Sequence, residues 1–448
     1  MATGIPRKSS SERGRPNGAE PALHYGGKAQ AEAVRGAPYE RSALVCEVNP
    51  PAPANRLYYG DNLDVLMELA GGGIKGMVRL AYIDPPFSTN GRFECRNRNA
   101  AYDDTLQGAE YVEFMRRRLL LIHDLLSDDG SMYLHLDSNM VFHMKLVMDE
   151  VFGGRNFRAL ITRRKCSNKN YTRNTYGNVS DYILFYTKTD DYVWNRPYVP
   201  WDEDRILKEY PCLDEGTGRR YKKVPIHAPG ERNGGTGRPW RGVSPPPGKH
   251  WQYPPERLEE LDRNGEIYWS RTGNPRRKVY LDESEGVPVQ DIWLDCRDSV
   301  NQNDRVTGYP TEKNIGMLRR IVSASSGPGD LVMDCFCGSG STLDAASQLG
   351  RAWIGIDSSI EAIGSTVRRF TEGTGRHGDY VTGGQGRPLP PTPGEGFGVY
   401  VSPCHDAARA EEVARLLEGH LPRPRAAAQA ALGQSPAGGP SPAGAWQP

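Results

Sequence analysis

The chain has 448 residues, enough for two or three domains with a large core. Its formal net charge is only +1, so overall charge gives no argument for binding nucleic acid, and any such argument must come from local patches. Eight scattered cysteines without a Cys-x-x-Cys pair argue against a zinc site or a disulfide framework. From the cysteine pattern we expect no metal. No signal peptide and no run of about 18 apolar residues is found, so we expect a cytoplasmic protein.

The first ordered segment is predicted to begin near residue 56. Residues 1–50 are rich in Gly, Ser, Arg and Glu without apolar periodicity, which predicts a disordered N-terminal tail. In 56–70 a short strand is followed by Gly60-Asp61-Asn62, a turn and helix N-cap, and then by leucines at helical spacing.

The next strand ends in an unusual tip. The apolar run Leu80–Ile83 stops at Asp84-Pro85-Pro86-Phe87. Two prolines cannot lie inside a sheet, but they fix two φ angles and leave carbonyl oxygens free to accept hydrogen bonds. A carboxylate and a carbonyl beside an aromatic face suit a planar ring that bears an amino group. The alternative is a Pro-rich turn in which Asp84 is only a local cap.

Alternating strands and helices follow. The pattern predicts helices over 109–126 and 138–151 and strands over 131–137, 157–164 and 181–189. Such alternation is typical of an α/β fold with a mostly parallel sheet and helices on its faces.

The middle and the end of the chain differ from the first part in composition and in the secondary structure they predict. Residues 191–305 are rich in Pro, Gly, Trp, Tyr and Arg, which predicts a loop-rich insertion with one short helix near 255–264. Regular α/β texture resumes with a helix over 309–325 and strand, turn, helix and strand over 330–359. Residues 376–448 are predicted to be a low-complexity tail.

The turn Asp334–Thr342 follows an apolar strand and opens a helix. Its glycines allow close backbone approach, and the helix start presents free N–H groups. Asp357 ends the next strand, at about the 20-residue offset at which a carboxylate meets ribose hydroxyls. Leu343 stands where a dinucleotide motif has its third glycine, and no Lys follows Gly340 as in a P-loop. A nucleoside cofactor without phosphates is therefore favoured over a tight turn that binds no ligand.

Three motifs in this order resemble one enzyme family. Tyr82–Phe87, Tyr309–Lys313 and Asp334–Thr342 are similar to the S-adenosylmethionine-dependent DNA amino-methyltransferases of the β group. The modification subunits of type III restriction systems are also similar. The resemblance covers about 55–375 and implies a Rossmann-like S-adenosylmethionine-dependent methyltransferase fold with circularly permuted motif order.

The resemblance also assigns the expected domains. They are a disordered tail (1–50), a catalytic half (51–190), a target recognition insertion (191–305), a cofactor-binding half (306–375) and a C-terminal tail (376–448).

By the same resemblance, the Asp-Pro-Pro-Phe group holds the target base, and the Phe-x-Gly-x-Gly set wraps the methionine part of S-adenosylmethionine. The chain departs from the family in having Glu312-Lys313-Asn314 for Gln-Lys-Pro and Cys335-Phe336-Cys337 for Pro-Phe-Ala. The catalytic residues expected are Asp84, Pro85, Pro86 and Phe87. The cofactor-binding residues expected are Asp61, Asn62, Thr311, Lys313, Asp334, Phe336, Gly338, Gly340, Ser341, Thr342 and Asp357.

Two basic segments predict contact with DNA. Residues 163–173 hold basic residues and no acidic one, with Tyr171 among them, and 216–250 are strongly basic with Tyr221 and Trp240 interleaved. Such residues neutralise phosphates and contact bases, although a solvated charged loop is the alternative. The DNA-binding residues expected are Arg163, Arg164, Lys165, Lys169, Arg219, Arg220, Lys222, Lys223 and Arg241.

The resemblance favours N6-adenine methylation of double-stranded DNA, because cytosine N4 enzymes of the family usually have Ser at position 84. N4-cytosine methylation is the alternative within the family. From other classes, a nicotinamide-dependent dehydrogenase leaves Asp84–Phe87 unexplained, and a DNA-binding protein without turnover has no need of an intact site. A homodimer and a restriction subunit are the further partners that the family implies.

Overall fold

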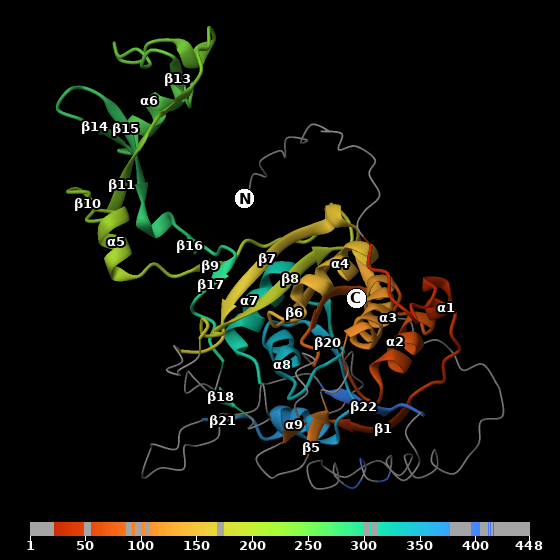
Figure 1. Cartoon of the computed structure of the whole chain (residues 1–448). Helices are drawn as coiled ribbons and strands as arrows, with labels where there is room; N and C mark the ends of the chain where they lie inside the picture. The colour runs from red at the N-terminus through yellow and green to blue at the C-terminus, as the bar shows by residue number, and fades with distance from the viewer. Residues whose placement is uncertain are drawn as a thin grey trace, which may run out of the picture. The chain divides into compact units, whose positions relative to one another are not determined.

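The computed structural model describes residues 22–48, 55–86, 92–94, 100–103, 108–167, 174–298, 305–306, 312–376 and 396–403, with positions 411, 413 and 415. Two compact units divide it (Figure 1): the first takes in 1–195 and 290–448, and the second is 196–289. The second unit lies inside the insertion that the sequence predicts over 191–305.

The first unit is organised around a ten-stranded sheet with the order β1-β22-β2-β20-β19-β3-β6-β8-β7-β17. Its strands are parallel from β22 through to β6, which confirms the predicted α/β class. Late strands β20 and β19 lie between early strands β2 and β3, as a circularly permuted motif order requires. The bounds are β1 (Ala43–Val48), β22 (Phe397–Val401), β2 (Asn55–Tyr59), β20 (Ala352–Asp357), β19 (Leu331–Asp334), β3 (Val78–Ile83), β6 (Leu126–Leu136), β8 (Ser180–Thr187), β7 (Phe157–Arg164) and β17 (Ile292–Trp293).

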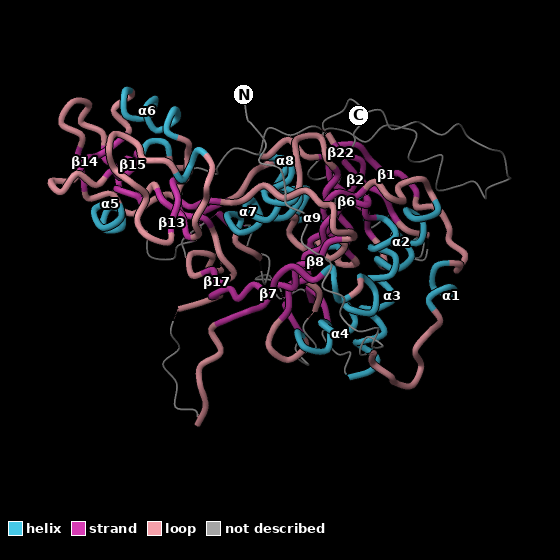
Figure 2. Tube along the Cα trace, turned by 90° about the horizontal axis from the view of Figure 1, so that it is seen from above, coloured by secondary structure: helices cyan, strands magenta, loops and turns pink. Residues whose placement is uncertain are grey.

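Helices cover both faces of this sheet (Figure 2). On one face α1 and α2 pack against α3, and α3 packs against α4, over a large apolar core shared with β3 and β6. On the other face α8 packs against α7 and α9. The bounds are α1 (Ala31–Arg35), α2 (Asn62–Gly71), α3 (Gly108–Leu125), α4 (Val141–Phe152), α7 (Ile315–Ser325), α8 (Ser341–Gln348) and α9 (Ile360–Thr371), with a 3₁₀ turn at Gly154–Asn156. Two short ladders join β4 (Arg92–Glu94) to β5 (Ala100–Asp103) and β18 (Arg305–Val306) to β21 (Gly375–Arg376).

Side-chain caps fix where two of the site-forming helices begin. Asp61 caps α2 by accepting a hydrogen bond from the Leu63 N–H at 2.7 Å, as predicted. Helix α7 begins at Ile315 rather than near 309, because the Asn314 side chain accepts from the Met317 N–H at 3.0 Å and so caps it there.

Both predicted tails contribute a strand to the sheet, so those two boundaries are wrong. β1 pairs antiparallel with β22, which itself lies beside β2. The Phe397 ring packs 5.2 Å from Trp353 and 5.4 Å from Phe370, measured between ring centroids. Burial against an aromatic pair that is distant in the sequence stabilises this five-residue strand. The Gly- and Pro-rich sequence around the strand does not indicate this packing.

The second unit has its own sheets and a small core. A four-stranded sheet has the order β10-β11-β15-β14, and two-stranded ladders pair β12 with β13 and β9 with β16. Helix α5 (Glu203–Glu209) was not predicted, whereas α6 (Pro255–Arg263) matches the expected short helix. The core gathers Ile226, Trp240, Trp251, Leu258, Leu261 and Ile267. The strands are β9 (Tyr198–Val199), β10 (Cys212–Leu213), β11 (Arg220–Pro225), β12 (His227–Pro229), β13 (Lys249–Trp251), β14 (Ile267–Trp269), β15 (Pro275–Tyr280) and β16 (Val287–Pro288), with 3₁₀ turns at Gly235–Gly237 and Leu281–Glu283.

Within the described ranges, no helix is both long enough and apolar enough to cross a membrane.

Candidate active site

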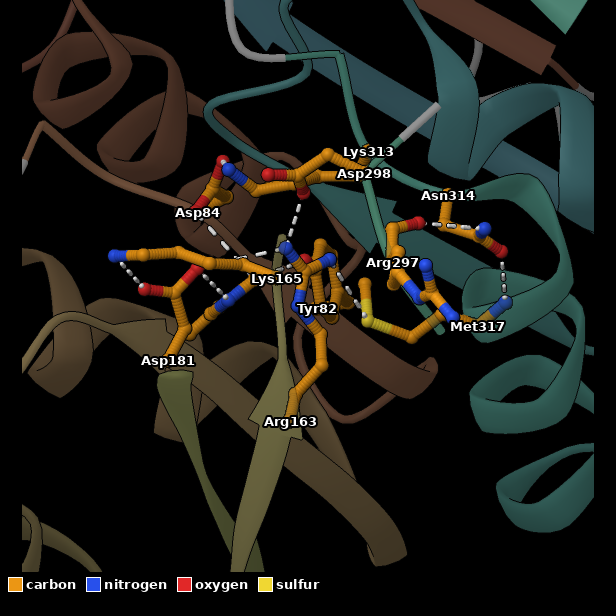
Figure 3. A network of polar contacts seen from close by, with 11 residues as sticks. Tyr82, Asp84, Arg163, Lys165, Asp181, Arg297, Asp298, Lys313, Asn314 and Met317 are labelled. Carbon is orange, nitrogen blue, oxygen red and sulfur yellow. Dashed lines mark hydrogen bonds and ion pairs between the residues drawn. The ribbon is translucent and has the colours of Figure 1, made fainter. Parts of the chain in front are cut away.

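Asp84 follows the carboxyl end of β3, beside the strand end that carries the glycine-rich turn. Its Oδ2 lies 2.7 Å from the Lys313 Nζ (Figure 3). Its Oδ1 is buried, has no hydrogen-bond donor among the described residues, and lies 3.5 Å from His135 Nδ1. A buried acceptor without a donor is costly, so this oxygen is suited to receive one from a ligand.

The rest of the predicted tip is only partly described. Pro85 is buried and Pro86 is half-buried, directly after Asp84. Phe87, which was expected to stack on the target base, lies outside the described residues.

The glycine-rich turn connects β19 to α8 and is shaped by two residues with positive φ. Gly338 (φ 52°) donates its N–H to Asp357 Oδ2 at 2.8 Å. At Gly340 (φ 75°) a Cβ would lie 2.8 Å from the Thr366 side chain, so only glycine fits. Asp357 also accepts from the Ser359 N–H at 2.9 Å. The turn and the two strand ends therefore form one rigid cradle.

Two carboxyls in this cradle have raised pKa values. Burial raises the pKa of Asp334 to about 7 and that of Asp357 to about 6. Asp334 Oδ1 accepts from the Phe336 N–H at 3.0 Å, which offsets only part of the cost of burying its charge. Such carboxyls favour a ligand that brings hydroxyl donors or positive charge.

The predicted residues Asp61 and Asn62, at the start of α2, are linked to the cradle by hydrogen bonds. Asn62 Nδ2 donates to the Cys335 carbonyl at 2.7 Å. The buried guanidinium of Arg118 bonds to Asn62 and, at 2.7 Å, to Asp61 Oδ1, and burial lowers the pKa of Arg118 to about 10. Sequence reasoning missed Arg118, although an arginine on the apolar face of α3 was a visible signal.

Arg369 was also missed, and it ties the cradle to the segment before α7. Its guanidinium is buried, donates to the Ser339 carbonyl at 2.7 Å and forms ion pairs with Glu312 and with Asp344 (3.1 Å). Arg369 also reaches Ser341 Oγ at 3.2 Å. Ser341 and Thr342 are buried at the start of α8. Thr311 lies outside the described residues.

The structure contradicts the predicted DNA contact by Arg163. This side chain is fully buried because it pairs with Asp298 and lies 3.5 Å from Asp181 Oδ2, with Met317 beside it (Figure 3). Lys165 also turns to Asp181, at 2.8 Å. The neighbouring Arg164 is partly exposed and donates to the Cys166 carbonyl at 3.1 Å, and Lys169 lies outside the described residues.

In the second unit the predicted basic residues fall into two groups. Arg219 is paired with Asp282 (2.6 Å) and Glu283 (2.8 Å), and Arg241 is paired with Glu259 (2.6 Å) and Asp262. Across the described part of the chain, no carboxylate lies within ion-pair distance of Arg220, Lys222 or Lys223. Lys222 Nζ lies 4.8 Å from the centre of the Tyr210 ring, and Lys223 Nζ lies 3.5 Å from that of Tyr268.

The fold is an α/β sheet in which the glycine-rich turn after β19 lies beside the carboxylate that follows the neighbouring strand β3. The chain belongs to the DNA methylase family, whose model matches residues 78–368. This confirms the family that the motifs predict, and the chain is a DNA methyltransferase.

Two curated relatives show the range of the similarity. The type II methyltransferase M.EcaI of Enterobacter cloacae is 51% identical over 327 residues, which are 73% of this chain and 72% of the relative. The StyLTI Mod subunit, from a type III restriction-modification enzyme of Salmonella typhimurium, is 27% identical over 66% of this chain, and the matched part is half of its own length. Among solved structures, the M1.HpyAVI–SAM complex has 15% identity and a TM-score of 0.38, and the match covers 70% of this chain and 98% of that one.

Proposed function

We propose that this DNA methyltransferase transfers a methyl group from S-adenosylmethionine to the N6 amino group of an adenine in double-stranded DNA. The observation that carries the proposal is the Asp84 carboxylate, with its buried Oδ1 lacking a donor among the described residues. Asp rather than Ser at this position favours adenine over cytosine N4.

The chemistry needs positioning more than a strong base. An exocyclic amino nitrogen is a poor nucleophile because its lone pair is delocalised into the ring. If Asp84 and the Pro85 carbonyl accept its two hydrogens, the nitrogen becomes pyramidal and its lone pair can point at the methyl group. The base must first leave the duplex, at a cost of a few kcal/mol, and stacking on Phe87 would offset part of that cost.

The cradle residues fit S-adenosylmethionine. When bound, this cofactor supplies a methyl group on a positively charged sulfur. In this proposal Asp357 accepts from the ribose hydroxyls, the turn at Gly338–Gly340 approaches the methionine part, and Asp334 balances positive charge. The hydrogen bond from the Gly338 N–H to Asp357 and the raised pKa of buried Asp334 support these assignments. Lys313 Nζ lies 2.7 Å from Asp84, the carboxylate proposed to hold the target base.

Incubation with labelled S-adenosylmethionine and unmethylated DNA, followed by digestion to nucleosides, tests the proposal. We expect label in N6-methyladenine. Label in N4-methylcytosine would overturn the choice of base while keeping the reaction, and the absence of label from DNA would overturn the proposed function as a whole.

Cofactor affinity is expected to fall at acid pH. The pKa of Asp357 is about 6, so its carboxylate is mostly ionised at pH 8 and mostly protonated at pH 5, where it can no longer accept from both ribose hydroxyls. We expect the Kd for S-adenosylmethionine to rise about tenfold from pH 8 to pH 5. Titration calorimetry measures this, and Asp357→Asn should reduce the dependence to the part that Asp334 contributes. An equal slope in both proteins would contradict the assignment.

The second unit is proposed to bind DNA through Lys222 and Lys223. Replacing both with Ala should weaken DNA binding and reduce the dependence of log K on log salt by about 1 for each phosphate that is no longer neutralised. Arg219→Ala is the matched control, because Asp282 and Glu283 already neutralise Arg219. Fluorescence anisotropy at several salt concentrations measures both slopes. A larger loss of affinity in the control would show that the DNA-binding surface lies elsewhere.

We place the enzyme in restriction-modification or other DNA marking, in the cytoplasm of a bacterium or archaeon. The support is the kinship with M.EcaI and the Mod subunits. A second copy of the chain and a restriction subunit are the proposed partners. Light scattering of the purified chain, alone and on DNA, tests the first.

A further inference from the structure

A row of polar side chains crosses four neighbouring strands beside Asp84. It begins with Asp84 after β3, continues with His135 on β6 and Asp181 on β8, and ends with Arg163 on β7. Arg163 lies opposite Asp181 in the ladder, and His135 lies opposite Ile183, so the alternation of side chains brings the row onto one face of the sheet. His135, Asp181 and Arg163 in this row are buried, and buried polar groups need a specific reason to be there.

His135 links the two carboxylates of this row. Its ring is fully buried. Nδ1 lies 2.8 Å from the Tyr82 hydroxyl and 3.5 Å from Asp84 Oδ1, and Nε2 lies 3.5 Å from Asp181 Oδ2. A carboxylate at Nε2 favours the tautomer with the proton on that nitrogen, which leaves the Nδ1 lone pair directed at Tyr82 and Asp84.

Asp181 is held as a carboxylate. Burial acts to raise its pKa, but the contact with His135 and the positive charges of Lys313 and Lys165 outweigh burial and keep the pKa of Asp181 well below its usual range. Lys165 Nζ contacts Asp181 Oδ1 at 2.8 Å (Figure 3). The charge needed to stabilise a protonated ring at His135 is therefore permanently in place.

We propose that His135 is a positioning residue that receives, through Asp84, the proton released during methyl transfer. The amino nitrogen forms a bond to the methyl carbon as the carbon–sulfur bond breaks, and the sulfur keeps the bonding pair and loses its charge. The methylated base now carries the positive charge and releases one N–H proton to Asp84 Oδ1. Asp84 passes this proton to His135 Nδ1, which restores the carboxylate and leaves an imidazolium against Asp181. The proton returns to solvent after the product leaves.

The resting state suits this role. Burial lowers the pKa of His135, so the ring is neutral at neutral pH and able to accept a proton. Asp84 and Asp181 oppose that effect, whereas Lys313 and Arg163 add to it. The Tyr82 hydroxyl also contacts the ring, and Lys165 contacts Asp181 on the far side of it. The inference rests on the proposed role of Asp84, but it holds for an adenine and for a cytosine amino group.

The test is the pH profile of single-turnover methyl transfer to DNA, with S-adenosylmethionine kept saturating so that Asp334 and Asp357 do not contribute. His135→Gln keeps a donor for Asp181 but cannot take the proton. We expect about 10²-fold slower transfer with unchanged Kd for cofactor and DNA, and loss of the fall in rate that the wild type shows at acid pH. His123→Gln, on α3, is the matched control and should behave as wild type.

Asp181→Asn supplies a second variant, which decides the question if His135→Gln does not fold. Removing the anion destabilises the imidazolium, so the acid limb should move to lower pH and the rate should fall at least tenfold. Three results would each overturn the inference. The acid limb of the pH–rate profile could stay unmoved in Asp181→Asn, or the rate of His135→Gln could lie within twofold of wild type. The rate of His135→Gln could also be reduced by the same factor at every pH. Failure of the Asp84 assignment is distinct, because Asp84→Ala would then retain transfer.

Discussion

Asp84→Ala is expected to lower the rate of methyl transfer by about 10³-fold while leaving the Kd for S-adenosylmethionine within about threefold. The buried Oδ1 of this carboxylate has no donor among the described residues, and alanine removes the carboxylate without disturbing the hydrogen bond between the Gly338 N–H and Asp357. Transfer of labelled methyl groups to DNA under single-turnover conditions measures the rate, and calorimetry measures cofactor binding.

Two companion variants sharpen this result. Asp84→Asn keeps one acceptor oxygen but loses the ion pair with Lys313, so its rate should lie between those of Asp84→Ala and wild type. Asp330→Ala removes a carboxylate that pairs with Arg79 at the opposite end of β19, and it should leave the rate unchanged. If Asp84→Ala retained more than a tenth of the wild-type rate, Asp84 would not be the group that holds the target base.

The local parts of the site could be predicted because a few consecutive residues determine each of them. The local signals are a strand that stops at Asp84, a glycine turn after Asp334 and a strand that ends at Asp357. In a parallel sheet the carboxyl ends of the strands meet at one edge, which brings the three together. Family membership extends these signals, since the matched region 78–368 contains all three.

The rest depends on pairings between distant segments. His135 meets Asp181 only through the antiparallel register of β6 and β8, and Arg163 is buried only because Asp181 and Asp298 are placed beside it. From sequence, 163–165 is simply a basic run, and its charges predict contact with DNA. The strand β22 could not be predicted for the same reason, because the strands that pair with it lie in the first 60 residues.

Arg369→Met is expected to destabilise the protein by about 3–5 kcal/mol. The guanidinium pairs with Glu312 and Asp344, and all three side chains are at most 8% exposed, so the substitution takes a positive charge away from two buried carboxylates. Urea denaturation should show a lower midpoint with an unchanged slope. Arg368→Met, one position earlier on α9, is the control, because Arg368 is only half-buried and donates a hydrogen bond to Ser365 Oγ at 3.2 Å.

The same variant should weaken cofactor binding more than it changes the rate at saturating cofactor. Arg369 holds the Ser339 carbonyl at 2.7 Å inside the glycine-rich turn, and it also holds Glu312, the neighbour of Lys313. Without Arg369 the cradle loosens, whereas bound S-adenosylmethionine restores its geometry through Asp357 and Gly338. The prediction is contradicted if Arg369→Met loses less than about 1 kcal/mol of stability and binds the cofactor normally. Glu312 and Asp344 would then have other partners, and Asn62 and Arg118 alone would hold the cradle.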